Sequence, residues 1–91
     1  MGADQDVYLH TPGVEADATG AGVRLSDPAR GEAFLLNEVG GRIWELIDGD
    51  TTVGAIAVVL YDEFEVTWAT ALADAEALVA ELAAAGLVTA R

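Results

Sequence analysis

The spacing of apolar residues changes once along this chain, at Asn37, and this change sets the fold class. Before Asn37, apolar and polar residues alternate in short runs between turn-forming residues, as in β-strands. After Asn37, apolar residues recur about every three to four positions, as on one face of an α-helix. A single change from one period to the other predicts an α+β fold in which a small sheet is followed by helices.

Three short strands are expected before Asn37. They are residues 14–17, 23–25 and 31–36, separated by a turn cluster at 19–22 and a loop at 27–30. Strands joined by such short connections pair with their sequence neighbours in opposite directions. The pattern therefore predicts a three-stranded antiparallel meander.

Three helices are expected after the strands, since residue types that cap helices precede each helical pattern. The predicted start and end are Asn37 and 48–49 for the first helix, Thr51 or Thr52 and 62–63 for the second, and Thr67 and Gly86 for the third. The 91 residues are therefore expected to form one domain, with an amino-terminal arm at 1–13, the sheet at 14–36 and a helical bundle at 37–89.

The composition argues against catalysis and against a cofactor or metal site. The chain has no cysteine, and its only histidine, His10, lies in the weakly patterned arm, where a structural role is expected. Residues 48–50 lack the remaining ligands of a calcium loop, and the paired glycines lack the lysine of a phosphate cradle. We therefore expect a non-catalytic protein.

Charge and hydropathy limit the partners and the location. Sixteen Asp and Glu against four Arg give a net charge of −12, which repels nucleic acid and anionic membranes and favours a cationic partner. Residues 1–6 carry acid and lead into no signal-peptide core, and no run reaches the ~20 apolar residues of a membrane span. Together with the absence of cysteine, this predicts a cytoplasmic protein.

Residues 52–86 have the outline of a helix-turn-helix, with a short helix, a tight turn and a longer helix. A DNA-recognition helix presents Arg, Lys, Asn or Gln, and the predicted third helix contains none of them. It contains Asp74, Glu76 and Glu81 instead. The pattern therefore indicates a winged helix-turn-helix-like frame with a function other than DNA binding.

Several segments together carry a resemblance to a known family. In residues 34–49 a leucine and an asparagine precede a helix that ends in Asp-Gly, residues 52–60 follow as a second helix, and Asp74, Leu78 and the ending 86–88 complete the pattern. Over about residues 14–88 the chain resembles the PqqD-like family, the leader-recognition domains of ribosomal peptide maturation. The resemblance implies three antiparallel strands followed by three helices, with a leader peptide that adds itself beside the third strand and against the third helix.

The same resemblance implies the partners. A short acidic chain of this kind is similar to the free-standing recognition elements of lasso peptide biosynthesis. Their partners are the leader region of a precursor peptide, a leader peptidase and an asparagine-synthetase-like cyclase. The amino-terminal arm and Trp68 depart from the common family pattern.

The expected peptide site has a strand and a helix as its walls. An edge strand offers unpaired N–H and C=O groups to an extended peptide, and the third strand would supply Glu32, Ala33, Phe34, Leu35 and Leu36. The third helix would supply one of two flanks, either Leu72, Ala75, Glu76, Val79 and Ala83 or Ala71, Asp74 and Leu78. The sequence leaves the flank open, although we expect Ala75 to leave space for a bulky leader side chain.

Two further alternatives stay open. Taken singly, Phe34, Leu36, Leu72, Val79 and Leu82 fit an ordinary core better than a peptide site. Glu32, Asp74 and Glu76 either pair with basic leader residues or form a solvated acidic face. For the whole chain, the alternative is an acidic winged helix that binds or regulates another protein without any precursor peptide. Neighbouring precursor, peptidase and cyclase genes would favour leader binding.

Overall fold

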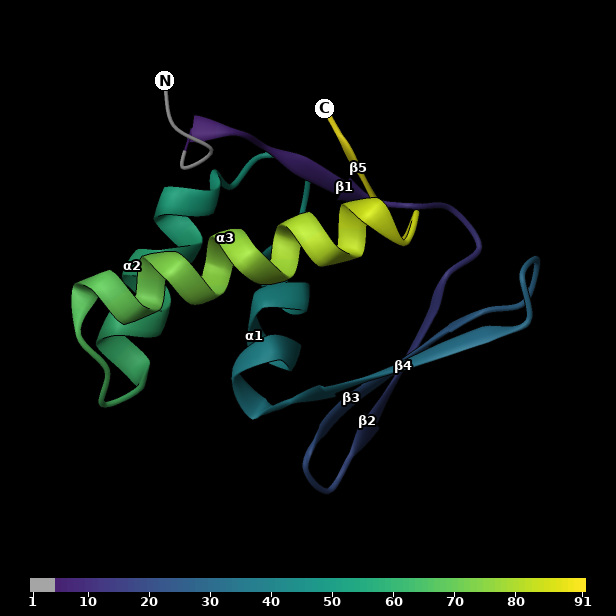
Figure 1. Cartoon of the computed structure of the whole chain (residues 1–91), viewed down its shortest axis with the longest axis horizontal. Helices are drawn as coiled ribbons and strands as arrows, with labels where there is room; N and C mark the ends of the chain where they lie inside the picture. The colour runs from purple at the N-terminus through teal and green to yellow at the C-terminus, as the bar shows by residue number, and fades with distance from the viewer. Residues whose placement is uncertain (1–4) are drawn as a thin grey trace.

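The computed structural model describes residues 5–91 as a short ribbon, a three-stranded sheet and three helices (Figure 1). In chain order the elements are β1 (Tyr8–His10), β2 (Glu15–Thr19), β3 (Gly22–Asp27), β4 (Glu32–Asn37), α1 (Glu38–Leu46), α2 (Val53–Glu63), α3 (Trp68–Ala84) and β5 (Val88–Ala90). The first four residues of the expected amino-terminal arm lie outside the described range. The order confirms an α+β fold with three antiparallel strands followed by three helices.

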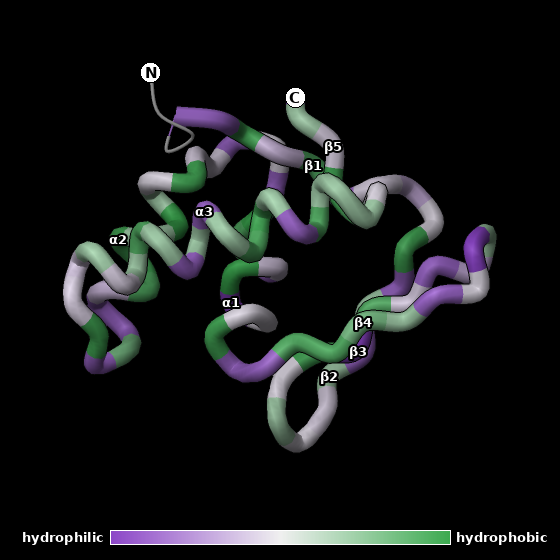
Figure 2. The backbone as a smooth tube through the Cα atoms, in the orientation of Figure 1, coloured by the Kyte–Doolittle hydropathy of each residue, from purple (hydrophilic) through white to green (hydrophobic). Residues whose placement is uncertain are grey.

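The sheet is an antiparallel meander in the order β2-β3-β4. A two-residue turn joins β2 to β3, so that Thr19 pairs with Gly22, and a four-residue loop closed by backbone hydrogen bonds to the Asp27 carbonyl joins β3 to β4. Figure 1 shows the sheet extending away from the helices, with β4 leading directly into α1. In Figure 2, the hydrophobic end of β4 gives way to a polar start of α1.

Side-chain caps begin all three helices. The side chains of Asn37, Thr52 and Thr67 accept hydrogen bonds from the backbone N–H groups of residues 40, 55 and 70. Thr52, and not Thr51, therefore caps the second helix. Gly86 follows the end of α3 with a φ of +77°, a left-handed conformation that glycine adopts at low cost.

The core lies between the helices and one face of the sheet. Its buried side chains are Leu25, Ile43, Trp44, Ile47, Val53, Ile56, Ala57, Leu60, Ala71, Ala75, Val79, Leu82, Leu87 and Val88. All the strands and helices except β2 contribute side chains to this core or pack against it. Among residues 5–91, no helix is long and apolar enough to cross a membrane.

A second, two-stranded sheet joins the two ends of the chain. β1 pairs antiparallel with β5, with Tyr8 opposite Ala90 and His10 opposite Val88. The His10 ring stacks on Trp44 with centroids 3.6 Å apart, and its Nε2 donates to the Trp44 carbonyl at 2.8 Å. His10 therefore has structural contacts, and the weak pattern of the arm did not predict this ribbon.

Candidate functional site

The outer edge of β4 is open among the residues that the structure describes. β4 pairs with β3 on one side and has no strand on the other. Its side chains alternate, so that Phe34 and Leu36 are half-buried against the core while Leu35 is 78% exposed on the opposite face. The strand therefore presents backbone hydrogen-bonding groups along a free edge, next to apolar side chains that face the helices.

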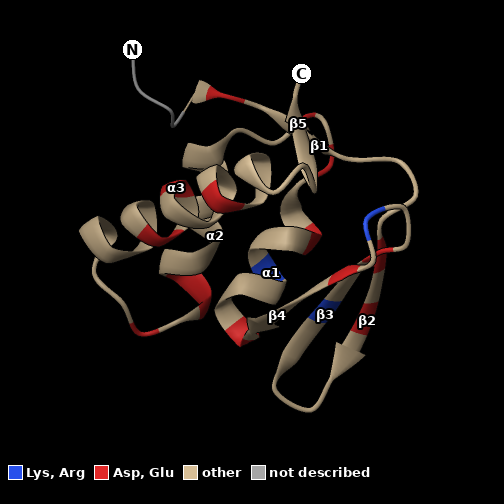
Figure 3. Cartoon of the chain, turned by 45° about the vertical axis from the view of Figure 1, so that its right-hand side comes forward, with Lys and Arg blue, Asp and Glu red and all other residues tan. Residues whose placement is uncertain are grey.

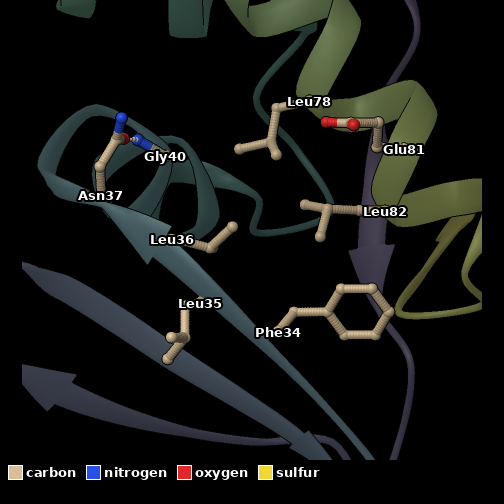
Figure 4. A pocket seen from close by; sticks show the side chains of 8 residues that line it. All are labelled: Phe34, Leu35, Leu36, Asn37, Gly40, Leu78, Glu81 and Leu82. Carbon is tan, nitrogen blue, oxygen red and sulfur yellow. Dashed lines mark hydrogen bonds between the residues drawn. The ribbon is translucent and has the colours of Figure 1, made fainter.

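A hollow of about 310 Å³ lies beside this edge, between β4, the start of α1 and α3. It is lined by Phe34, Leu35, Leu36, Asn37, Gly40, Leu78, Glu81 and Leu82. Figure 4 shows Leu36 and Phe34 on the β4 side, with Leu78, Glu81 and Leu82 projecting from α3 toward them. Most of its wall is therefore aliphatic or aromatic.

A second hollow of about 280 Å³ continues from the first, past the end of β4 and between α1 and α3. It is lined by Asn37, Val39, Gly40, Ile43, Asp74, Ala77, Leu78 and Glu81. Because Asn37, Gly40, Leu78 and Glu81 line both hollows, the two form one continuous depression. We call it the β4–α3 groove.

Asn37 and Gly40 form the middle of the groove, at the corner between β4 and α1. The Asn37 Oδ1 accepts a hydrogen bond from the Gly40 N–H at 2.8 Å, which fixes the corner between β4 and α1. A Cβ on Gly40 would lie 3.3 Å from the Leu36 Cβ and 3.4 Å from a Leu78 methyl carbon. A side chain there would therefore narrow the groove at its centre.

The structure selects the flank of α3 that faces β4. Asp74 and Leu78, from the second of the two expected sets, line the groove. Leu72 and Glu76 are half-buried and Ala83 is exposed, and none of these three lines either hollow. Ala71 and Val79 belong to the buried core.

The expectation that Ala75 leaves space for a leader side chain is wrong. Ala75 is completely buried, because it lies in the middle of the α3 stripe that packs into the core. The groove is also lined by residues that were not predicted as site residues: Asn37, Gly40, Ala77, Glu81 and Leu82. The spacing of Asp74, Leu78 and Glu81, four and three residues apart, marks one helix face and was the available signal.

The groove is acidic at its α3 wall. Figure 3 shows acidic positions along α3 and no basic position on that helix. Within residues 5–91, the ion pairs join Arg30 to Asp27, Arg42 to Glu45 and Glu63, and Arg91 to Asp50, so none involves Asp74 or Glu81. The same residues contain no group of three or more His, Asp or Glu side chains that could hold a metal ion.

Comparisons with known proteins agree on this frame. A family model described as coenzyme PQQ synthesis protein D (PqqD) matches residues 22–88, and no curated protein matches the chain in sequence. The solved structure of TbiB1 in complex with the TbiA(beta) leader peptide is similar, with a TM-score of 0.78 and 25% identity over 88% of this chain and 93% of that one. A lasso peptide synthetase B1 complexed with the leader peptide has a TM-score of 0.80 and 27% identity over 90% and 96%. Since the family match spans well over half of the sequence, and the strands and helices follow the same plan, this chain belongs to the PqqD family.

Proposed function

We propose that this protein binds the leader segment of a ribosomally synthesised precursor peptide and delivers it to maturation enzymes. The leader would add as a further strand along β4 and place alternate side chains in the β4–α3 groove. The protein itself would perform no chemistry. A cytoplasmic location is part of this proposal, because a cysteine-free acidic chain needs no oxidising compartment.

The open edge of β4 beside the groove is the observation that carries the proposal. An added strand gains backbone hydrogen bonds on its β4 side, whatever its sequence, while every second side chain enters the groove. Two relatives of similar fold are complexes with leader peptides, which supports the same class of ligand here.

Delivery follows from tethering. A leader held on this domain brings the attached core peptide close to any enzyme that the domain also contacts, which raises its effective concentration. By analogy with the lasso peptide relative, we propose a leader peptidase and a cyclase as those enzymes.

Titration of the isotope-labelled protein with a synthetic candidate leader peptide tests the strand addition. We expect the largest amide shifts at Glu32–Asn37 and at the groove face of α3, around Leu78 and Glu81. Shifts confined to β2 or to the β1–β5 ribbon would contradict the proposed edge.

A matched pair of substitutions on α3 tests the groove. Ala77 is exposed and lines the second hollow, whereas Ala83 is also exposed but lines neither hollow. Ala77→Trp should fill the hollow and weaken leader binding by about tenfold or more, since a bulky ring excludes the peptide side chain. Ala83→Trp should leave the affinity unchanged in calorimetry. Equal effects of the two substitutions would overturn the assignment of the flank.

A further inference from the structure

Apolar side chains line the whole β4–α3 groove, whereas its two carboxylates lie at and beyond the junction of the two hollows. Beside β4, the groove is walled by Phe34, Leu36 and Leu82. Past the end of β4, Asp74 joins the wall, and Glu81 lies where the two hollows meet. A peptide that follows β4 and continues beyond Asn37 therefore passes Phe34, Leu36 and Leu82 first. It then meets the carboxylates of Glu81 and Asp74, which lie among the apolar side chains of Val39, Ile43 and Leu78.

The protein supplies no cation for these two carboxylates within residues 5–91. The chain has no lysine, and three of its four arginines form the ion pairs at Asp27, at Glu45 and Glu63, and at Asp50. The fourth, Arg24, donates to Ser26 on β3. Only a bound partner can therefore place a cationic side chain beside Asp74 or Glu81, where the two charges would attract each other.

The spacing of the α3 side chains fits an extended peptide. Side chains on one face of a strand repeat about every 6.8 Å. Along α3, Leu82 to Leu78 and Leu78 to Asp74 are each four residues, or about 6 Å at the helical rise. Successive inward side chains of an added strand would thus meet Leu82, then Leu78 and Glu81, then Asp74.

We infer that the β4–α3 groove selects an extended peptide that carries an apolar residue and, two or four positions from it, a Lys or Arg. This inference rests on the proposed leader binding and adds a specificity determinant to it. The apolar residue of the peptide lies beside Phe34, Leu36 and Leu82. The cationic residue is in the part of the peptide that extends past the carboxyl end of β4, beside Glu81 or Asp74. The carboxylates then favour one class of leader over others that can form the same backbone bonds.

Selection from a randomised display library of peptides tests this inference. Three forms of the full chain serve as bait: the unmodified protein, Glu81→Lys, and Asp62→Lys as a control with the same change in net charge on exposed α2. We expect the unmodified protein and the control to enrich Lys or Arg at a constant distance from an apolar residue. Glu81→Lys should enrich Asp or Glu at that same position.

A thermodynamic cycle with one selected peptide then measures the contact. Glu81→Gln in the protein and Lys→Gln in the peptide should each weaken binding by about threefold, the range of a partly exposed ion pair. Combining them should cost no more than either alone, because both remove the same interaction. Circular dichroism of each variant confirms that the fold is retained.

The outcomes separate this inference from the proposed function. Enriched peptides that alternate apolar residues without a charge preference would overturn the cationic determinant and leave leader binding in place. An equal loss of preference in Glu81→Lys and Asp62→Lys would also overturn it, since overall charge would then be the cause. Failure of all three proteins to enrich any peptide, together with no shifts at β4 on addition of the leader, would overturn both.

Discussion

At the residue scale, the alanines of α3 differ in what they contact. Ala75 is completely buried in the core, whereas Ala80 projects into solvent from the opposite side of the helix. A larger side chain at a buried position in a well-packed core forces its neighbours apart, and at an exposed position it has room.

Ala75→Leu should therefore lower the free energy of unfolding by about 1 to 3 kcal/mol. Ala80→Leu should change it by less than about 0.5 kcal/mol. Urea denaturation followed by circular dichroism measures both. A stable Ala75→Leu protein would mean that the core beside α3 has unfilled space.

Hydrogen bonds within the turn that follows α1 change the pKa of Asp48. Its Oδ1 accepts from the N–H groups of Asp50 at 2.9 Å and Thr51 at 2.8 Å, and the Thr51 hydroxyl donates to its Oδ2 at 3.0 Å. These hydrogen bonds, with the one from Asp50 as the largest cause, lower the pKa of Asp48 below its usual value of 3.8.

The direction of this shift fixes the pH dependence. Because the folded-state pKa lies below the unfolded one, the carboxylate stabilises the fold above the unfolded pKa, and this contribution is lost as the pH falls through the folded pKa. Asp48→Asn should therefore be less stable than the unmodified protein at about pH 7, and the difference should shrink at about pH 3. Urea denaturation at both pH values checks this. A difference that stays constant would show that the charge is not involved.

At the element scale, the close approach of α1 to the sheet depends on Gly41. A Cβ at this position would lie 2.8 Å from a methyl carbon of Val23 on β3. Alanine is the better helix former by about 1 kcal/mol, so propensity and packing oppose each other at this position. Packing should win, because valine has little freedom about χ1 and cannot turn its methyl group away.

Gly41→Ala should therefore destabilise the protein although it removes a glycine from a helix. Val23→Ala removes the methyl group that the new side chain would meet, so the double substitution should cost less than the sum of the two single ones. Free energies of unfolding from urea titrations complete the cycle. Strict additivity would indicate that α1 shifts away from β3 and avoids the contact.

At the scale of the whole molecule, the amino-terminal arm is tied to the helices through His10. Its stacking on Trp44 and its hydrogen bond to the Trp44 carbonyl join residues that are far apart in the chain, next to the β1–β5 ribbon. His10→Ala removes both interactions and should lower the free energy of unfolding by about 1 to 2 kcal/mol.

His10→Phe keeps an aromatic ring on Trp44 and loses the hydrogen bond, so its stability should fall between those of the unmodified protein and His10→Ala. Thermal denaturation ranks the three proteins. If His10→Ala were as stable as the unmodified protein, the stacking and the hydrogen bond of the His10 ring would contribute nothing to the folded state.

Local patterns account for the parts of this protein that the sequence predicted well. The change of period at Asn37 separated sheet from helices, and Asn37 and Thr67 marked helix starts, because caps and periodicity depend on neighbours within a few residues. The resemblance over residues 34–49 and 74–88 similarly pointed to the family whose model matches residues 22–88.

Contacts between distant segments decided the rest. β1 and β5 are three residues each and lie at opposite ends of the chain, so the residue pattern of either strand does not predict their pairing. The choice of Thr52 over Thr51 depends on Asp48, which engages the Thr51 hydroxyl and N–H.

The sequence by itself determined the order of the three meander strands and the three helices, an acidic surface and a third helix with apolar residues on more than one flank. Only the tertiary structure decided which flank of α3 is core and which faces β4, placing Ala75 inside and Leu78 with Glu81 at the groove. The physical reason is that successive helical residues differ by about 100° around the axis. A small rotation of the whole helix, set by its packing against α1, α2 and the sheet, therefore exchanges groove residues for buried ones.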